Sequence, residues 1–415
     1  MREADMDPLC AFALVLLLVT VLTARYRLSP FLTLIAAAIL FGVSTGMGGE
    51  MIPLITSGAG KIFALLGIPI FCGSLIARAL RHGGYLTRIV GDLERTVHRP
   101  AITAGVAGYL LAIPLMCCIT PFIVLAPVIG HLEQDPASVR RLLYITAFGS
   151  VVSFVLLFPL PVAYTIVTAL ETGSAVEPYM AMAIPVSLLF LAGGIFFLGK
   201  GGKAPEQAPS VPDTPRWKAW APVVVPVAMI IAGSALPALH PLGNIHIALL
   251  TGAAIALVIV PESVRGEVME KGTRHAGIII FDLCGAGALG AVIGAGGFAA
   301  EVFSLLDTHV PAIIIPFLLA ALIQTAQGSR VVTAVVTSSL VAGTSLASTV
   351  PPVPLILMIA AGTLVFSYIS DPYFWLVLRT TGDTIAGTLS RYTLPQAVAG
   401  GVLAAVTAVI SMTAL

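Results

Sequence analysis

The sequence has little charge. Asp, Glu, Lys and Arg make up 10% of its 415 residues, whereas soluble globular domains carry about 25%. Most of the surface must therefore face something other than water, which excludes an ordinary soluble domain. The formal net charge of +1 gives no indication of a nucleic-acid partner.

Cysteine and histidine form no recognisable chemical motif. The five cysteines lie in apolar segments without the spacing of a metal site or a disulfide framework, so we interpret them as small buried residues. The seven histidines are scattered, and no His-Glu-x-x-His or nucleophile–base set is present. We therefore expect no enzyme, no bound metal, and no cofactor other than a coupling ion, a proton or Na⁺.

Long apolar runs dominate instead. Hydrophobic residues make up 58% of the chain, and about 20 apolar residues span a bilayer. We predict an all-α polytopic membrane protein whose partner is the lipid bilayer. The acidic start, Met1–Asp7, is unlike a signal peptide, so the first span is expected to be retained. The candidate spans are 9–24, 29–46, 62–80, 101–131, 142–170, 179–198, 219–238, 245–260, 276–293, 310–345, 352–378 and 393–414.

Basic residues mark one side of the membrane. Of the 21 Lys and Arg residues, all except Arg2, Lys61 and Arg330 fall in loops that can be placed on a single side. Cytoplasmic loops carry an excess of Lys and Arg, so this side is predicted to be the cytoplasm. The chain is then expected in the cell inner membrane, with both termini extracytoplasmic.

Two segments must enter and leave on the same side. The loops flanking 101–131 are both basic, and those flanking 310–345 are both poor in Lys and Arg. Each segment is also interrupted, the first at Ile113–Pro121 and the second at Gln327–Ser329. We predict two helical hairpins, one from each side, and leave open whether each is re-entrant or two short crossings.

The spans recur at an offset of about 213 residues. Corresponding loops carry opposite charge character, which indicates two inverted-topology repeats, 1–198 and 219–415, joined by a cytoplasmic linker at 199–218. Each repeat would hold about five transmembrane helices plus one hairpin. Inverted repeats with broken helices near the membrane midplane are typical of secondary transporters.

Arg330 is the leading candidate for chemistry. No other Asp, Glu, Lys or Arg lies between Asp307 and Asp371, and a charge at membrane depth costs at least about 3 kcal/mol. A helix beginning after the break would aim its N-terminus, together with Arg330, at a carboxylate. The alternative is that Arg330 only pairs with a buried acid, Asp282 or Asp371. The substrate-binding residues expected around this break are Gln327, Gly328, Ser329, Arg330 and Thr333.

Asp371 precedes Pro372, which breaks the helix there. We expect Asp371 and Asp282 to bind the coupling ion. If the ion is a proton, these carboxylates titrate. If it is Na⁺, Asp371 and Ser370 coordinate it together with carbonyl groups freed by the break. The alternative is a helix-end carboxylate near the interface. Gly285–Gly290 has two interpretations as well: close helix packing, or an opened hairpin tip that brings Gly287 to the substrate.

A family resemblance is carried by four places in the chain: Ile113–Leu115 followed by Phe122–Pro127, then Gly285–Gly290, Ala326–Ser329 and Ser367–Val377. These stretches resemble the gluconate permease (gluconate:proton symporter) family of the ion transporter superfamily. The last is the most specific, since it retains Asp371 and Phe374-Trp-Leu-Val377. The resemblance implies proton-coupled uptake of sugar acids by a homodimer, in which mobile transport domains move against a scaffold in an elevator-type cycle.

The departures from the family pattern are specific. Met116-Cys-Cys-Ile-Thr120 stands where the family usually has Phe-Phe-Asp-Val-Gly, so the resemblance places Cys118 and Thr120 at the substrate but without that acid. Arg330 stands where the family has a small residue, and Asp282 is also unexpected. This pattern indicates a relocated charge scheme, and a small carboxylate other than gluconate remains an equal alternative.

Taken as a sequence, the chain is predicted to be an ion-coupled, most simply proton-coupled, symporter of a small organic anion such as gluconate or a related sugar acid. A Na⁺-coupled carboxylate symporter or an exchanger is the alternative within transporters. An anion channel is the alternative from another class, although inverted repeats with two broken hairpins argue against it.

Overall fold

The computed structural model describes residues 6–24, 26, 28–97, 99–129, 135–199, 213–236, 241–298, 301, 310–368 and 370–413. Within these ranges every regular element is helical, which confirms the all-α prediction. Most of the expected linker at 199–218 lies outside the described residues. The helices of the first half are α1 (Pro8–Ala24), α2 (Pro30–Ser44), η1 (Gly48–Glu50), α3 (Met51–Leu80), α4 (Tyr85–Val97), α5 (Pro100–Leu115), α6 (Ile119–Ile129), α7 (Pro136–Leu156), α8 (Pro161–Ala169), η2 (Gly173–Ala175) and α9 (Val176–Leu198).

The second half begins at α10. Its helices are α10 (Arg216–Ala235), α11 (Ile245–Ile259), α12 (Glu262–Ala295), η4 (Ala312–Ile314), α14 (Ile315–Gln327), α15 (Arg330–Ala342), α16 (Leu346–Thr349), α17 (Pro352–Leu364), α18 (Pro372–Thr381), α19 (Ile385–Thr388), the π-helical turn η5 (Leu389–Thr393) and α20 (Leu394–Thr413).

Prolines determine where many of these helices begin. Helices α2, α5, α7, α8, α17 and α18 each carry Pro in the first turn, where the missing N–H leaves no hydrogen bond unmade. Side-chain caps add to this. Ser29 accepts from the Leu32 N–H at the start of α2, and Asp135 accepts from the Ser138 N–H at the start of α7.

Five stretches are long and apolar enough to cross a membrane, and shorter apolar helices accompany them. Stretches of this length fit a hydrocarbon core of about 30 Å, and the short ones include both halves of each interrupted segment described below. The five are Gly48–Leu80, Pro136–Ala169, Gly173–Leu198, Glu262–Ala295 and Ile385–Ser411.

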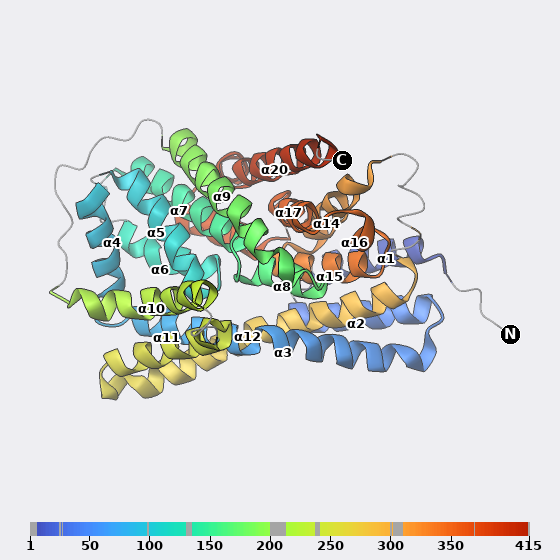
Figure 1. Ribbon diagram of the computed structural model, residues 1–415, viewed down its shortest axis with the longest axis horizontal. Coiled ribbons are helices and arrows are strands. Elements are labelled where there is room, and N and C mark those ends of the chain that lie inside the picture. The colour runs from blue at the N-terminus through green and yellow to red at the C-terminus, as the bar shows by residue number, and fades with distance from the viewer. Residues whose placement is uncertain are drawn as a thin grey trace.

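Figure 1 shows the helices in two layers. Helices α2, α3, α11 and α12 form the lower layer, in which α12 contacts both α2 and α3. Helices α5, α7, α9, α14, α15, α17 and α20 lie above it, and α12 contacts α15 between the layers. The polar centre described below lies in the upper layer, on helices that are interrupted.

Small residues bring α3 and α12 into close contact. A Cβ added to Gly58 or to Gly287 would overlap the backbone of the other glycine. Helix α12 runs unbroken from Glu262 to Ala295. Of the two interpretations of Gly285–Gly290, close helix packing is the one that the structure shows, because this stretch packs as a continuous helix through its glycines.

Both segments expected to be interrupted contain a break. Helix α5 ends at Leu115 and α6 begins at Ile119, while α14 ends at Gln327 and α15 begins at Arg330. Two further breaks separate α7 from α8 and α17 from α18. The organisation of the chain as two inverted repeats stays a prediction.

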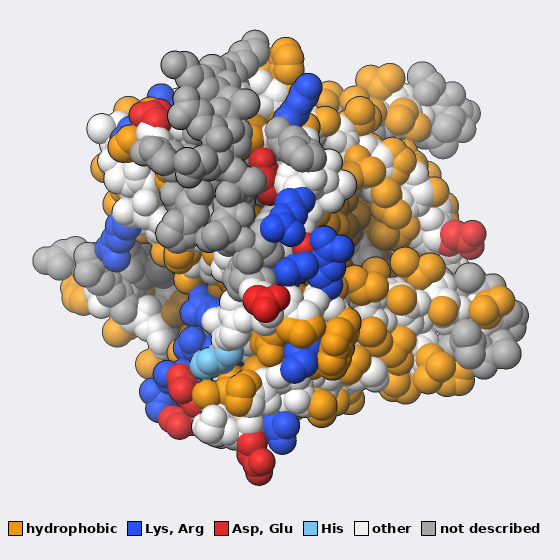
Figure 2. Space-filling model, turned by 90° about the vertical axis from the view of Figure 1, so that its left-hand side faces the viewer, with side chains coloured by type: hydrophobic (Ala, Val, Ile, Leu, Met, Phe, Trp, Pro, Cys, Tyr) orange, Lys and Arg blue, Asp and Glu red, His pale blue; other side chains and the backbone are white. Residues whose placement is uncertain are grey.

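Lysine and arginine gather on one end of the molecule. Figure 2 views the left-hand end of Figure 1, and many blue side chains lie across it beside an orange apolar flank. Ion pairs join elements near this end. Both Arg88 of α4 and Arg216 of α10 pair with Asp92, at 3.2 and 3.1 Å. A gathering of basic charge at one end is the distribution expected of a cytoplasmic face.

Candidate functional site

The break between α14 and α15 fits against the break before α18. Gly328 ends α14 in the left-handed conformation, with φ of 68°, and a Cβ there would overlap the carbonyl group of Ser370. The Ser370 hydroxyl in turn donates to the Thr325 carbonyl at 2.7 Å. The two interruptions therefore support one another, and each supplies polar groups to the same interior space.

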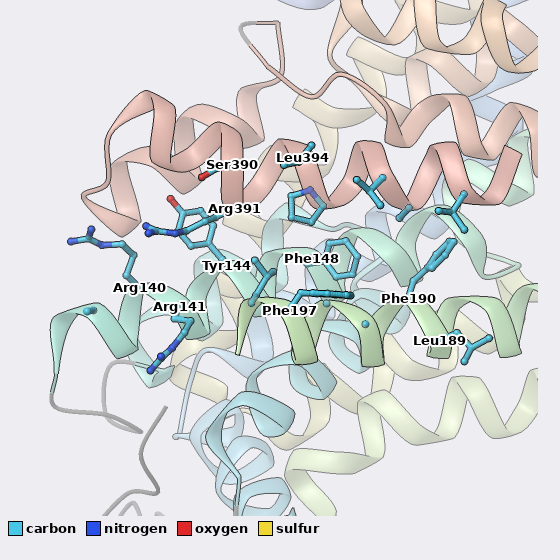
Figure 3. A pocket seen from close by; sticks show the side chains of 18 residues that line it. Arg140, Arg141, Tyr144, Phe148, Leu189, Phe190, Phe197, Ser390, Arg391 and Leu394 are labelled. Atoms are coloured by element: carbon cyan, nitrogen blue, oxygen red, sulfur yellow. The ribbon is translucent and has the colours of Figure 1, made fainter. Parts of the chain in front are cut away.

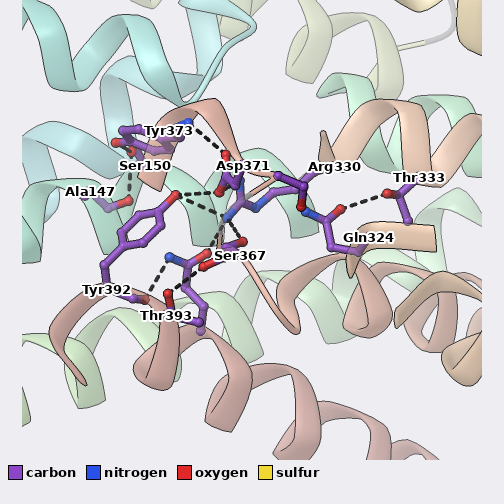
Figure 4. Close-up of polar contacts among 12 residues, drawn as sticks. Ala147, Ser150, Gln324, Arg330, Thr333, Ser367, Asp371, Tyr373, Tyr392 and Thr393 are labelled. Atoms are coloured by element: carbon purple, nitrogen blue, oxygen red, sulfur yellow. Dashed lines mark hydrogen bonds and ion pairs between the residues drawn. The ribbon is translucent and has the colours of Figure 1, made fainter. Parts of the chain in front are cut away.

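Arg330 begins α15 and points into that space with only 4% of its surface exposed (Figure 4). Its Nη1 donates to Asp371 Oδ2 at 3.4 Å, and its Nη2 donates to Ser367 Oγ at 2.6 Å. Nη2 also donates to the Tyr392 hydroxyl, at 3.4 Å, and to the side-chain oxygen of Gln396. We call these five residues the Arg330 cluster.

Asp371 balances the charge of Arg330. It is the N-cap of α18, where its Oδ1 accepts from the Tyr373 N–H at 2.8 Å. Its Oδ2 accepts from the Tyr392 hydroxyl at 3.1 Å as well as from Arg330. Pairing a buried guanidinium with a buried carboxylate removes the large penalty of an isolated charge. The cluster therefore carries no net formal charge.

Two buried donors, one in the cluster and one on α14, have no hydrogen-bond partner. They are Nε of Arg330 and Nε2 of Gln324. Gln324 is held in place through its other end, because its Oε1 accepts from the Thr333 hydroxyl at 2.8 Å across the α14–α15 break. In the view of Figure 4, Gln324 and Thr333 are drawn on the opposite side of Arg330 from Tyr392. A buried donor without a partner costs free energy, so the pair offers hydrogen bonds to an anion.

The first interrupted segment reaches the same region. Cys118, between α5 and α6, is buried and close enough to Arg330 and Asp371 to interact with them electrostatically. The ring of Phe122 on α6 packs edge-to-face on Tyr373 of α18, with centroids 5.5 Å apart. Thr120 turns elsewhere, because its hydroxyl lies 3.5 Å from Nε2 of His275 on α12. The structure thus brings Cys118 toward Arg330 but directs Thr120 to α12.

The other expected site residues divide in the same way. Asp282 accepts from the Phe31 N–H at 3.1 Å, at the start of α2, so it is Asp371 rather than Asp282 that pairs with Arg330. Ser329 is the half-buried N-cap of α15, without a side-chain capping bond. Gly287 packs on α3, and the side chain of Gln327 lies outside the described residues.

Tyr392 and Gln396 were missed by sequence reasoning. Both are buried and lie next to Arg330, in or just after the π-helical turn η5. A lone Gln in an otherwise apolar span was the available signal, because a buried amide needs partners. Among the described residues, no group of three or more His, Cys, Asp or Glu is placed to hold a metal ion.

An all-helical chain with membrane-length apolar helices, interrupted helices and a buried charge-balanced centre belongs to the class of membrane transporters. Comparison with known proteins identifies the family. A sequence model of GntP family permeases matches residues 8–213 and 217–413. The chain belongs to this family, as the sequence predicted, and it is a membrane permease rather than an enzyme.

Similar proteins extend over nearly the whole chain. The inner membrane permease YgbN of Escherichia coli is 24% identical over 94% of this chain and 96% of its own. The high-affinity gluconate transporter of the same organism is 23% identical over 94% and 96%. The Gnt-II system L-idonate transporter, also from E. coli, is 23% identical over 94% and 95%. The crystal structure of the YdaH transporter of Alcanivorax borkumensis has a similar fold, with a TM-score of 0.58, 17% identity and 87% of each chain covered.

Proposed function

We propose that this permease is a proton-coupled symporter of a small organic anion, gluconate or a related sugar acid, in the cell inner membrane. The names of its relatives support the substrate class, since they include gluconate and L-idonate transporters. One observation carries the coupling: Arg330 and Asp371 form a buried ion pair where two helix breaks meet.

The charge balance supplies the coupling. With Asp371 ionised, Arg330 is already neutralised, and an anion entering the cluster would add an unbalanced buried charge. A proton taken up by Asp371 removes the carboxylate charge and leaves Arg330 as the partner of the substrate carboxylate. Proton and anion then favour each other's binding by the same free energy, because coupling between two ligands is reciprocal.

The unpartnered donors define the binding geometry. Nε of Arg330 together with a freed Nη offers the planar fork that suits a carboxylate. Nε2 of Gln324 adds a donor beside it. Ser329 and the adjacent Gly328 backbone lie at the start of α15, whose N-terminus also favours negative charge. Substrate hydroxyls would then meet the remaining side-chain oxygens.

The two layers of Figure 1 suit alternating access. In this proposal the interrupted helices of the upper layer move as a unit against the lower layer of α2, α3, α11 and α12, in an elevator-type cycle within a homodimer. Helix α1 and the end of α20 lie in the right-hand half of Figure 1, away from the basic end in Figure 2. This arrangement supports extracytoplasmic termini.

The decisive experiment compares Asp371→Asn with wild type in liposomes supplied with radiolabelled gluconate. Asn keeps the capping oxygen that accepts from the Tyr373 N–H but cannot change its charge. We expect the variant to lose accumulation driven by an inward proton gradient, while keeping exchange of labelled for unlabelled substrate. Asp282→Asn is the matched control, because Asp282 lies outside the Arg330 cluster, and it should retain proton-driven accumulation.

Two results would contradict the proposal. Proton-driven accumulation by Asp371→Asn equal to wild type would exclude Asp371 as the proton site. Accumulation that follows a Na⁺ gradient at equal pH on both sides would make the protein a Na⁺-coupled symporter. A panel of unlabelled carboxylates competing with gluconate then identifies the preferred substrate.

A further inference from the structure

A groove with a charged end and an apolar end lies on the upper layer, and its lining residues do not include those of the Arg330 cluster. It has a volume of about 940 Å³ and is bounded by α7, α9 and the η5–α20 segment (Figure 3). Gly193 and Gly194 of α9 both line it. A Cβ on Gly193 would meet nothing within 4 Å, so the groove depends on the absence of side chains there.

The charged end is built from three arginines and one aspartate. Arg391 pairs with Asp383 at 2.7 Å and Arg140 pairs with it at 3.5 Å, while Arg141 donates to Ser138 Oγ at 2.7 Å. Nε of Arg140 is buried without a partner. Tyr144 fixes the base of this end by donating to Asp383 at 2.9 Å.

Asp383 stays ionised, so it offsets only one of the arginine charges. Burial alone would raise its pKa, but hydrogen bonds from the Thr384 N–H, Tyr144 and Arg391, together with the Arg391 charge, hold the pKa below its ordinary value. Asp135 at the start of α7 interacts electrostatically with Arg141, while Arg140 and Arg391 share Asp383, so the described charges at this end sum to one positive charge. This end of the groove attracts an anion with more than one oxygen, such as a phosphodiester.

The other end is apolar and open. Phe148, Phe190 and Phe197 line it from α7 and α9, and Val398 and Val402 line it from α20. Phe197 and Val398 are 72% and 54% exposed, which is costly in water but not against lipid tails. From Ala137 to Phe148, α7 rises about 16 Å. One leaflet of the hydrocarbon core is about 15 Å deep.

We propose that this groove binds an anionic phospholipid, with its phosphate at Arg140, Arg141 and Arg391 and an acyl chain along the apolar wall between α9 and α20. The charged end lies where α7 begins and α20 begins, in segments assigned to the cytoplasmic side by their charge. Basic pockets between helices on that side suit anionic head groups. A soluble anion would use the arginines alone and leave the long apolar wall without an occupant.

The test uses purified protein in detergent, incubated with equimolar phosphatidylglycerol and phosphatidylcholine of identical chains and examined by native mass spectrometry. We expect phosphatidylglycerol adducts to exceed phosphatidylcholine adducts at least tenfold. Arg141→Gln removes one contact to the head group. Gly193→Leu places a side chain in the open part of the groove that would hold the acyl chain. Each variant should lower the phosphatidylglycerol adduct several-fold. Arg274→Gln, an exposed arginine on α12, is the matched control and should bind like wild type.

Four results would overturn the proposal. The first is equal binding of both lipids, and the second is phosphatidylglycerol binding unchanged in both groove variants. The third is displacement of the lipid by soluble glycerol phosphate at equal concentration, which would mean that only the head-group end is a site. A dimer that Gly193→Leu converts to monomer, without any lipid adduct in wild type, would assign the groove to a second copy of the chain. Melting temperatures of the variants within a few degrees of wild type show that each remains folded.

Discussion

Gly328 lies directly against the carbonyl group of Ser370, with no room for a side chain between them. The contact joins the α14–α15 break to the segment that precedes α18, although the two residues are 42 positions apart in the sequence. Arg330 and Asp371, which pair with each other, each lie within two positions of this contact. The geometry of the ion pair therefore depends on how closely the two breaks pack.

Replacing Gly328 by Ala should destabilise the protein and abolish most uptake. A left-handed conformation costs a non-glycine residue about 1–2 kcal/mol, and the overlap with Ser370 adds to that. Gly343→Ala is the matched control, because Gly343 has a φ of −81° and the nearest atom to its Cβ would be 3.7 Å away. Thermal melts in detergent should show a lower melting temperature for Gly328→Ala only. Equal melting temperatures would show that the breaks can separate without loss.

Replacing Arg330 by Lys keeps the positive charge but removes the planar array of guanidinium donors. A lysine has its three donors on one nitrogen, so it does not reproduce the separate bonds of Nη1 to Asp371 and of Nη2 to Ser367 and Gln396. A hydrogen bond to a charged group contributes about 1.5–3 kcal/mol. We expect substrate uptake to fall tenfold or more, with the apparent affinity for carboxylate reduced. Arg379→Lys, an exposed residue at the end of α18, should transport normally. Wild-type uptake by Arg330→Lys would mean that a point charge is sufficient.

Much of this site could be predicted from the sequence because charge is so scarce in it. Arg330 was identified as the only Lys, Arg, Asp or Glu in a long apolar stretch, and Asp371 by the proline that follows it. Both predictions rest on the free energy of single residues. A buried ion is unfavourable without a partner, and proline fits the first turn of a helix but disrupts its interior. The all-helical fold could be predicted because apolar runs of membrane length admit few structures. The family was indicated by the resemblance of short motifs, above all Ser367–Val377.

The partners of Arg330 could not be predicted as securely. Sequence spacing left Asp282 and Asp371 as equal candidates, and only tertiary packing places Asp282 at the start of α2. Tyr392 reaches Asp371 because η5 winds as a π-turn, which no local pattern indicates. The role of Gly287 could not be predicted either. A sequence alone does not distinguish a glycine in an open loop from a glycine that packs two helices together.

Replacing Gly287 by Ala tests whether this residue packs α12 on α3 or contacts the substrate. The new Cβ would overlap Ile62 and the Gly58 carbonyl, and overpacking of this kind typically costs about 1–3 kcal/mol. We expect a lower melting temperature, while the KM of the folded fraction stays unchanged. Gly277→Ala, on the same helix in open space, should not lower the melting temperature. A raised KM with unchanged stability would return Gly287 to the substrate site.

Asp383 should make stability depend on acid pH. Its pKa is below the ordinary value in the folded protein, so the unfolded chain binds the proton more readily. The stabilisation is complete above the unfolded pKa of about 3.9 and is lost as the pH falls toward the folded pKa. Melting temperatures of wild type should therefore drop more steeply below about pH 4 than those of Asp383→Asn. Parallel curves for the two proteins would contradict this prediction, and Glu270→Gln, an exposed carboxylate on α12, should follow wild type.

In the proposed proton-coupled cycle, the equal and opposite charges of Arg330 and Asp371 also determine which force can drive uptake. An empty carrier whose centre is neutral crosses the electric field of the membrane without doing electrical work. A carrier loaded with one proton and one monovalent anion is neutral too, whereas an anion carried alone would move against about 2.3 kcal/mol for each 100 mV of inside-negative voltage. Uptake by such a carrier responds to the difference in pH and not to the voltage, so a cell that dissipates only its pH difference stops accumulating the substrate while its membrane remains electrically polarised.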